Sequence, residues 1–138
     1  MQLISFDEGG AADIAAHGTY RYGLWRKWNL GREDELGRQC AFIMLNPSTA
    51  NTSEDDPTLR RCIGFARSWG YESLAVANLF AYRTTDPKML REVDDPVGPR
   101  NDEALMEIAQ GADLLVTAWG TGEAHLTRGA GAGYPPAE

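Results

Sequence analysis

The sequence lacks a long hydrophobic run, a disulfide framework and a cluster of metal ligands. No apolar stretch approaches the ~20 residues of a membrane-spanning helix, so no membrane partner is expected. Two cysteines (Cys40, Cys62) and two distant histidines (His17, His125) do not supply the ligands of a zinc site, and neither a metal nor a cofactor is expected. The N-terminus carries no signal-peptide pattern. We therefore expect a cytoplasmic protein with both cysteines reduced.

Positive charge is also scarce. The 138 residues carry a net charge of -7, which argues against wrapping a nucleic-acid backbone, because such binding depends on Lys and Arg. Residues 58–91 are the exception, with an excess of four positive charges from six basic and two acidic residues. A local contact with a phosphate group or a nucleotide is therefore allowed, although ion pairs on a helix surface explain these arginines equally well.

The chain length and a hydrophobic content of 43% predict a single domain over residues 1–138. Strands are predicted at residues 19–28, 40–45, 74–80 and 113–119; helices are predicted at residues 57–69 and 99–110, with a short helical turn at 87–91. In the first strand Tyr20, Tyr22 and Leu24 alternate with Arg21 and Gly23, as in a half-buried strand. The ordered core is expected over residues 18–120. A tail at 121–138, rich in Gly, Ala, Thr and Pro, predicts disorder.

After the aromatic strand, the order strand, helix, strand, helix, strand predicts a three-layer α/β/α fold with a largely parallel central sheet. Polar residues follow each buried strand: Asn46, Pro47, Ser48 and Thr49, then Asn78 and Arg83, then Trp119 and Gly120. In open α/β sheets, ligands bind beyond the carboxyl ends of parallel strands. The sequence therefore predicts a ligand site at this edge.

Each candidate residue has a functional and a structural interpretation. The Asn46 carboxamide can orient a water or pair with a base edge, or it simply ends the strand in a turn. The buried Asn78 amide must find partners, in the loop backbone or in a ligand, or it destabilises the fold by ~1–3 kcal/mol. Arg83 suits bidentate contact with phosphate, or an ion pair with Asp86. Trp119 can stack on a planar ligand or pack in the core.

The loop before the first helix adds charged candidates. Asp56 suits the helix cap, which leaves Asp55 as a candidate base or cation ligand, or as a solvated loop residue. Arg60 and Arg61 are candidate anion-binding residues together with the helix N-terminus. No Ser-His-Asp set and no glycine-rich phosphate loop can be assembled.

With these residues in view, the chain resembles a family of uncharacterised bacterial and phage proteins. The resemblance runs from about Tyr20 to Gly120. Its hallmark segments are residues 21–26, 44–50, 56–62, 78–83, 86–87, 96–99 and 118–120. It implies no established activity.

A more distant likeness is to the uracil-DNA glycosylase superfamily, in which an Asn-Pro or Asp-Pro motif after the first parallel strand positions the hydrolytic water. Residues 45–48 are similar. The likeness implies that Asn46 orients water and that Asn78 reads a base flipped out of the stack. Glycosylases also carry a His-Pro motif after a last strand, whereas only the tail with His125 follows Gly120 here.

This departure predicts that the final strand and helix are lacking. Either the chain is a truncated or frameshifted family member, or its site works without that loop. The sheet edge left exposed would favour pairing, so a homodimer is expected as a possible assembly.

The leading hypothesis for function is a nucleotide- or nucleobase-directed hydrolase, glycosylase-like, acting at an N-glycosidic bond. Asn46 would position water, Arg83 or Arg60 would hold phosphate, and Trp119 would stack. The alternative is a non-catalytic module that binds a nucleotide, a short single-stranded nucleic acid or a protein partner. A third hypothesis is a degenerate, truncated family member.

Overall fold

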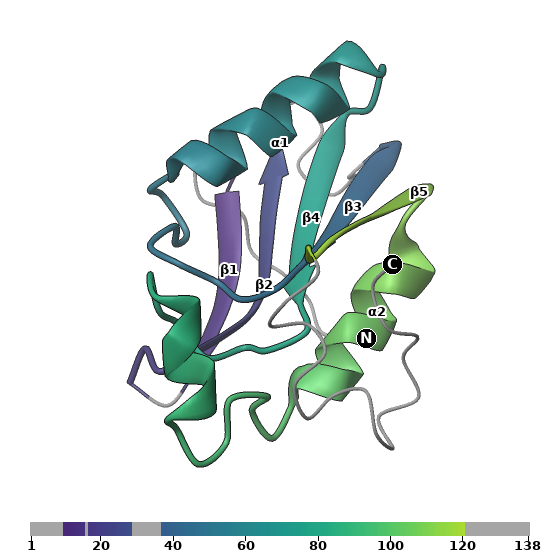
Figure 1. Ribbon diagram of the computed structural model, residues 1–138. Helices are drawn as coiled ribbons and strands as arrows, with labels where there is room; N and C mark the ends of the chain where they lie inside the picture. The colour runs from purple at the N-terminus through teal and green to yellow at the C-terminus, as the bar shows by residue number, and fades with distance from the viewer. Residues whose placement is uncertain (1–9, 16, 29–36, 121–138) are drawn as a thin grey trace.

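The computed structural model describes residues 10–15, 17–28 and 37–120, which form a mixed α/β domain (Figure 1). The strands are β1 (Gly10–Ala15), β2 (Tyr20–Lys27), β3 (Gln39–Met44), β4 (Ser73–Asn78) and β5 (Leu114–Ala118). The helices are α1 (Pro57–Ser68), the 3-10 helix η1 (Pro87–Arg91) and α2 (Asn101–Gly111). All the predicted elements are present, with bounds within a few residues of those expected.

The five strands form one sheet in the order β1-β2-β4-β3-β5. β3 pairs parallel with β4 and β5, whereas β2 pairs antiparallel with β1 and β4. The sheet is therefore mixed, and the prediction of a largely parallel sheet is not confirmed. The reason is the connection between β2 and β3, because residues 28–38 are too few for a helical crossover, and the chain returns in the opposite direction.

β1 is an element that the sequence analysis missed. Its residues, Gly-Ala-Ala-Asp-Ile-Ala, show no sustained alternation and no β-branched run. The strand forms because β2 offers a partner across a hairpin, at whose turn His17 and Gly18 both take positive φ angles of 58° and 89°. Pairing between strands thus decides the structure of a segment whose own sequence is uninformative.

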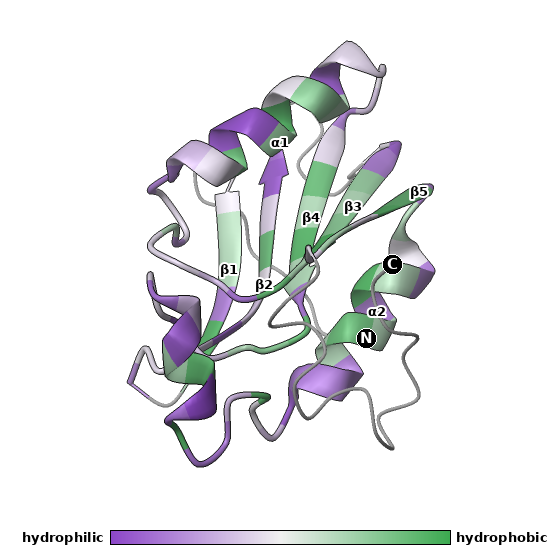
Figure 2. Ribbon diagram, viewed as in Figure 1, coloured by the Kyte–Doolittle hydropathy of each residue, from purple (hydrophilic) through white to green (hydrophobic). Residues whose placement is uncertain are grey.

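Two hydrophobic clusters lie on opposite faces of the sheet, because successive side chains of a strand point to opposite sides. On one face, α1 places Leu59 and Cys62 against Phe42 and Val76. We call this side the α1 face. The other, the α2 face, is lined by Leu105 and Ile108 of α2 together with alternate residues of β3 and β4. The hydrophobic colour in the middle of β3 and β4 marks the strand residues that supply both clusters (Figure 2).

Among the described residues, one α-helix packs on each face, and Leu90 of η1 also belongs to the α2-face cluster. The predicted three-layer arrangement is not confirmed and stays a prediction. β5 lies at the edge of the sheet, and no described strand pairs with its outer side. The predicted tail at residues 121–138 lies outside the described residues. No helix in the described ranges has both the length and the apolar character needed to cross a membrane.

The ends of α1 follow the predicted signals. The Asp56 carboxylate caps the helix by accepting a hydrogen bond from the backbone N–H of Leu59 (2.8 Å), and Pro57 occupies the first turn. Gly70 takes a φ of 88° just beyond the C-terminus, a conformation that favours glycine. The Asp56 carboxylate also accepts from the Ala50 backbone N–H, so the cap ties the N-terminus of α1 to the loop that follows β3.

Candidate functional site

The loops that follow β3 and β4 are held together by hydrogen bonds. The backbone N–H of Thr84 donates to the Pro47 carbonyl (3.1 Å), and the Asn46 side-chain amide donates to the Thr84 carbonyl (2.8 Å). The backbone N–H of Arg83 donates to the carbonyl of Thr19, at the start of β2 (2.9 Å). Segments far apart in sequence therefore meet at one edge, at the lower ends of β3 and β4 in Figure 1.

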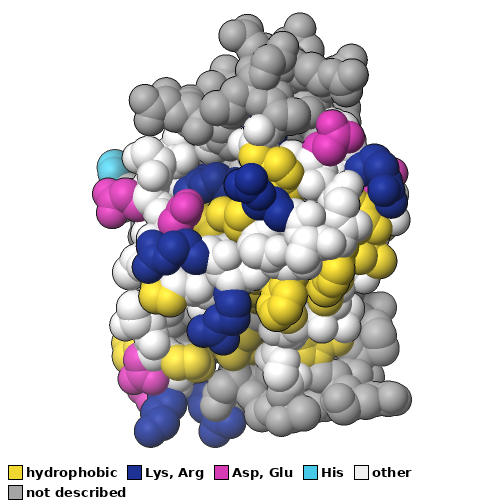
Figure 3. Space-filling view, turned by 90° about the horizontal axis from the view of Figure 1, so that it is seen from above, with side chains coloured by type: hydrophobic (Ala, Val, Ile, Leu, Met, Phe, Trp, Pro, Cys, Tyr) yellow, Lys and Arg dark blue, Asp and Glu magenta, His cyan; other side chains and the backbone are white. Residues whose placement is uncertain are grey.

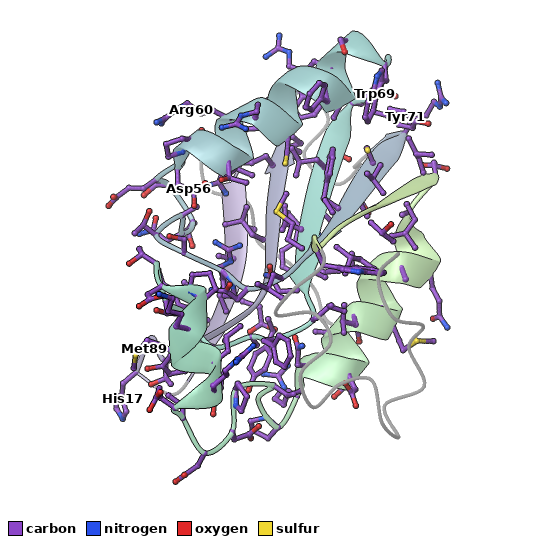
Figure 4. The ribbon with its side chains drawn as sticks, viewed as in Figure 1. His17, Asp56, Arg60, Trp69, Tyr71 and Met89 are labelled. Atoms are coloured by element: carbon purple, nitrogen blue, oxygen red, sulfur yellow. The ribbon has the colours of Figure 1, made fainter. Side chains whose placement is uncertain are left out.

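A small cavity of about 70 Å³ lies on the α1 face at this edge. Its lining combines polar and apolar side chains: Arg21, Met44, Asn46, Ser48, Ala50, Asp56, Thr58, Leu59 and Val76. In Figure 4, Asp56 lies at the first turn of α1, on the side of the sheet, and Arg60 lies on the outer side of the same turn. A water needs about 10–15 Å³, so the cavity has room for several waters or one group of phosphate size.

A β-bulge in β2 brings Arg21 to this cavity. In the pairing with β1, Asp13 lies opposite Gly23 and Ile14 opposite Arg21, so Tyr22 is an extra residue in β2. Without the bulge, Arg21 would share the α2 face with Gly23. The extra residue reverses the alternation, and the Arg21 guanidinium instead donates to the carbonyl of Ala50 beneath α1 (2.9 Å).

Arg21 is a buried cation with little compensation. Its side chain is 4% exposed, and its Nε has no hydrogen-bond partner. Within the described ranges, the bond to Ala50 is the one hydrogen bond of its side chain, and it forms no ion pair. Burial lowers the pKa of Arg21 to about 10, as do the nearby Arg83 and Arg26, whereas Asp56 opposes the shift. The guanidinium is therefore charged at neutral pH in a site that destabilises its charge.

The two aspartates beside the cavity are engaged. Asp55 forms an ion pair with Arg26 (Oδ1 to Nε, 2.9 Å), and Arg26 also donates to the carbonyls of Asn51 and Glu54. Asp56 accepts from the backbone at both oxygens, from the N–H of Leu59 and from that of Ala50 (3.3 Å). Asp55 is thus not a free carboxylate, and both residues fix the loop that precedes α1.

Three asparagines lie at or near the edge. Asn46 lines the cavity; its amide nitrogen is held by the carbonyls of Thr84 and Pro47, and its Oδ1 accepts from no described residue. Asn78 is 1% exposed, and neither its Oδ1 nor its Nδ2 has a partner. It pairs with Met44 in the sheet, so its side chain shares the α1 face. The Asn101 amide, from α2, holds the carbonyls of Asn78 (2.8 Å) and Leu79 (3.1 Å).

An open groove of about 440 Å³ adjoins the cavity. It is lined by hydroxyl side chains and one cation: Gly18, Ser48, Thr49, Arg83, Thr84 and Thr85. Ser48 lines both the groove and the cavity. The expected Arg83–Asp86 ion pair is not formed among the described residues. Asp86 instead caps η1, its carboxylate accepting from the backbone N–H of Lys88 (3.1 Å).

Other predicted site residues lie away from the cavity. Trp119 is half-buried against the α2-face cluster, on the opposite side of the sheet, and Gly120 is exposed beyond β5. Arg60 and Arg61 are exposed on the outer side of α1, where the Arg60 guanidinium donates to the Asp55 carbonyl (3.2 Å). In the view from above, basic and hydrophobic side chains are interspersed on the surface that includes α1 (Figure 3). The described ranges hold no group of three His, Cys, Asp or Glu placed to bind a metal ion.

Several residues that belong to this edge were not predicted from the sequence: Arg21, Thr58, Thr84, Thr85 and Asn101. Arg21 was predicted on the face opposite Tyr22 and Leu24, with no role in the site. One signal could have found it, because a glycine inside a strand pattern, here Gly23, often marks a bulge. Thr84 and Thr85 carry no such signal, since their role depends on contacts between loops.

Fold and site together define a mixed α/β domain with a small polar cavity that presents a buried arginine. The model of the family described as "protein of unknown function (DUF1643)" matches residues 21–131. The chain belongs to this family. A search of curated proteins and a search of solved structures each found no match.

Proposed function

We propose that this protein binds a phosphorylated small molecule of the nucleotide class, with a phosphate group in the cavity beside Arg21. The observation that carries this proposal is the state of Arg21, a charged and almost fully buried guanidinium that lines a cavity of phosphate size and makes one side-chain hydrogen bond to the described residues. Arginine presents five donors in a fork that matches the oxygens of phosphate or carboxylate. A bound anion would compensate a buried positive charge that no described carboxylate pairs with.

The surroundings of Arg21 favour an anion over a neutral ligand. The charged side chains that line the cavity and the groove are Arg21 and Arg83 against Asp56, an excess of one positive charge. The N-terminus of α1 points its dipole toward the same place. This local excess contrasts with the net charge of -7 for the whole chain.

The nucleotide class is proposed from the groups beside the phosphate. The cavity is too small for a base, which places the remainder of the ligand in the open groove, where four hydroxyl side chains can meet a sugar or a second polar group. The free Oδ1 of Asn46 at the cavity wall can accept from a ligand N–H or O–H.

Hydrolysis is the second candidate, and one observation favours it. The amide nitrogen of Asn46 is fixed by two carbonyls, which leaves its oxygen oriented and available to hold a water. The engaged carboxylates of Asp55 and Asp56 favour binding over hydrolysis, because a general base needs an available oxygen. A glycosylase-like reaction therefore ranks below simple binding.

Thermal unfolding of the whole chain tests the proposal. Inorganic phosphate and a panel of nucleoside monophosphates should raise the melting temperature, whereas the corresponding nucleosides should do so much less. A ligand at a hundred times its Kd adds about 2.7 kcal/mol. The shift should vanish in Arg21→Met and persist in Arg67→Met, a matched control at the far end of α1. If no phosphorylated compound shifts the wild type, the proposal is wrong.

Chromatography of the same mixtures separates the two candidates. Release of a free base or of phosphate that disappears in Asn46→Ala, with the ligand-induced thermal shift retained, would support hydrolysis. Unchanged nucleotides after prolonged incubation would leave binding as the function.

A further inference from the structure

The groove outside the cavity has the composition of a second anion subsite. Its lining is one guanidinium, from Arg83, together with the hydroxyl residues Ser48, Thr49, Thr84 and Thr85, of which Thr84 is bonded through its hydroxyl to the backbone of Asp86. Hydroxyl donors around a single arginine are a common way to hold phosphate oxygens in proteins. Gly18 at the groove wall has no side chain, and a Cβ there would lie 3.7 Å from Arg83 Nη1.

Arg83 is available for a ligand. Its one side-chain bond to a described residue is a long contact from Nε to the Ser48 carbonyl (3.5 Å), near the limit for a hydrogen bond. No carboxylate in the described part of the chain pairs with it. The neighbouring Asp86 accepts from the Lys88 N–H and is occupied as the cap of η1. The backbone of Arg83 is fixed by its bond to Thr19 (2.9 Å), so the side chain starts from a defined position.

The groove and the cavity share a wall residue, and the arginines that line them interact electrostatically. Ser48 forms part of the wall of both, so the two spaces are adjacent. The charge of Arg83 is among the causes that lower the pKa of Arg21, which means that the two guanidinium groups repel each other. An anion beside one of them relieves part of this repulsion. Two anionic groups, one in each space, relieve more of it.

We infer that the ligand carries two linked anionic groups, as in a diphosphate, with one group beside Arg21 in the cavity and the second beside Arg83 in the groove. This inference rests on the proposed function, because it takes the cavity as the first phosphate subsite. It defines the ligand class as diphosphate compounds rather than monophosphates.

Titration calorimetry with inorganic phosphate and with pyrophosphate tests the inference directly. The wild type should bind pyrophosphate at least about tenfold more tightly than phosphate, since a charge-assisted hydrogen bond changes affinity by roughly this factor or more. Arg83→Met should reduce this ratio to about twofold and leave the affinity for phosphate within about threefold of the wild type. Arg21→Met should abolish binding of both probes.

Two further variants keep the result specific. Thr49→Val removes a hydroxyl from the groove at nearly constant volume and should lower the affinity for pyrophosphate more than that for phosphate. Arg67→Met removes a positive charge from the far end of α1 and should leave the ratio unchanged, which separates the subsite from the overall charge effect. Each variant is first checked for cooperative unfolding.

The outcomes separate a failure of the second subsite from a failure of the proposed phosphate binding. If phosphate binds through Arg21 but pyrophosphate binds no more tightly, or if Arg83→Met keeps the full preference, the second subsite is wrong and the proposed function stands. If neither probe binds the wild type, both are wrong. Equal losses of the preference in Arg83→Met and Arg67→Met would reduce the effect to net charge and also overturn the subsite.

Discussion

Replacing Arg21 with methionine distinguishes an arginine kept for a ligand from one kept for stability. Methionine is uncharged and matches the aliphatic stem of arginine, so it can occupy that part of the space beneath α1. The substitution removes two things: a buried charge that the fold compensates poorly, and the hydrogen bond to the Ala50 carbonyl. Their balance decides the direction of the stability change.

The magnitude follows from the pKa of Arg21. Burial lowers it from the ordinary arginine value to about 10, and each pKa unit corresponds to about 1.36 kcal/mol. The folded pKa lies below the unfolded one, so the unfolded chain binds the proton more tightly and the charge opposes folding by about 3 kcal/mol at neutral pH. This penalty is fully present below about pH 10 and fades as the pH rises towards the ordinary pKa of arginine. Losing the bond to the buried Ala50 carbonyl costs about 1–3 kcal/mol.

Arg21→Met should therefore leave the ligand-free protein as stable as the wild type or up to ~2 kcal/mol more stable. For a domain of this size, 1 kcal/mol moves the melting temperature by about 3–4 °C. The expected change is thus between zero and about +7 °C. Breaking a well-paired buried ion pair costs about 3–5 kcal/mol, so a structural arginine would give a fall of 10 °C or more.

Calorimetric melting in a buffer without phosphate or other multivalent anions measures this change, and a second melt with phosphate measures the ligand effect. We expect the wild type to gain stability from phosphate and the variant to gain none. A fall of several degrees in the ligand-free variant would refute the reasoning, because Arg21 would then be held by interactions that stabilise the fold.

Three further predictions concern the structure around the site. Gly23→Ala would place a Cβ 2.5 Å from the Trp25 ring, so it should lower the free energy of unfolding in urea by about 1–3 kcal/mol. The control, Gly64→Ala on α1, adds a Cβ with nothing within 4 Å and should not destabilise the fold. Asp56→Ala removes the cap of α1 and should cost about 1 kcal/mol by the same assay; an unchanged midpoint would contradict the capping role. Burial raises the pKa of Cys62 to about 11, so about one thiol per thousand is ionised near pH ~8. Iodoacetamide should therefore modify Cys62 slowly until urea unfolds the chain. Rapid labelling of the native protein would argue against this burial.

The individual elements were largely predictable because their signals are local. The continuous apolar run of β3, the Asp56–Pro57 cap of α1 and the glycine that ends that helix depend on residues within a few positions of one another. The same holds for η1, where Asp86 and Pro87 start a short helical turn. Local signals also placed Asn46 and Arg83 on loops at one edge, and the structure brings these loops together.

The sequence by itself thus determined the elements, the mixed α/β character and the edge where polar loops gather. Tertiary structure alone decided the direction of β2 and the formation of β1, since both follow from pairing between strands. It also decided that Arg21 faces the cavity while Trp119 packs on the other side of the sheet. One extra residue in a strand reverses which face its neighbours occupy, and only the register with the partner strand reveals that residue.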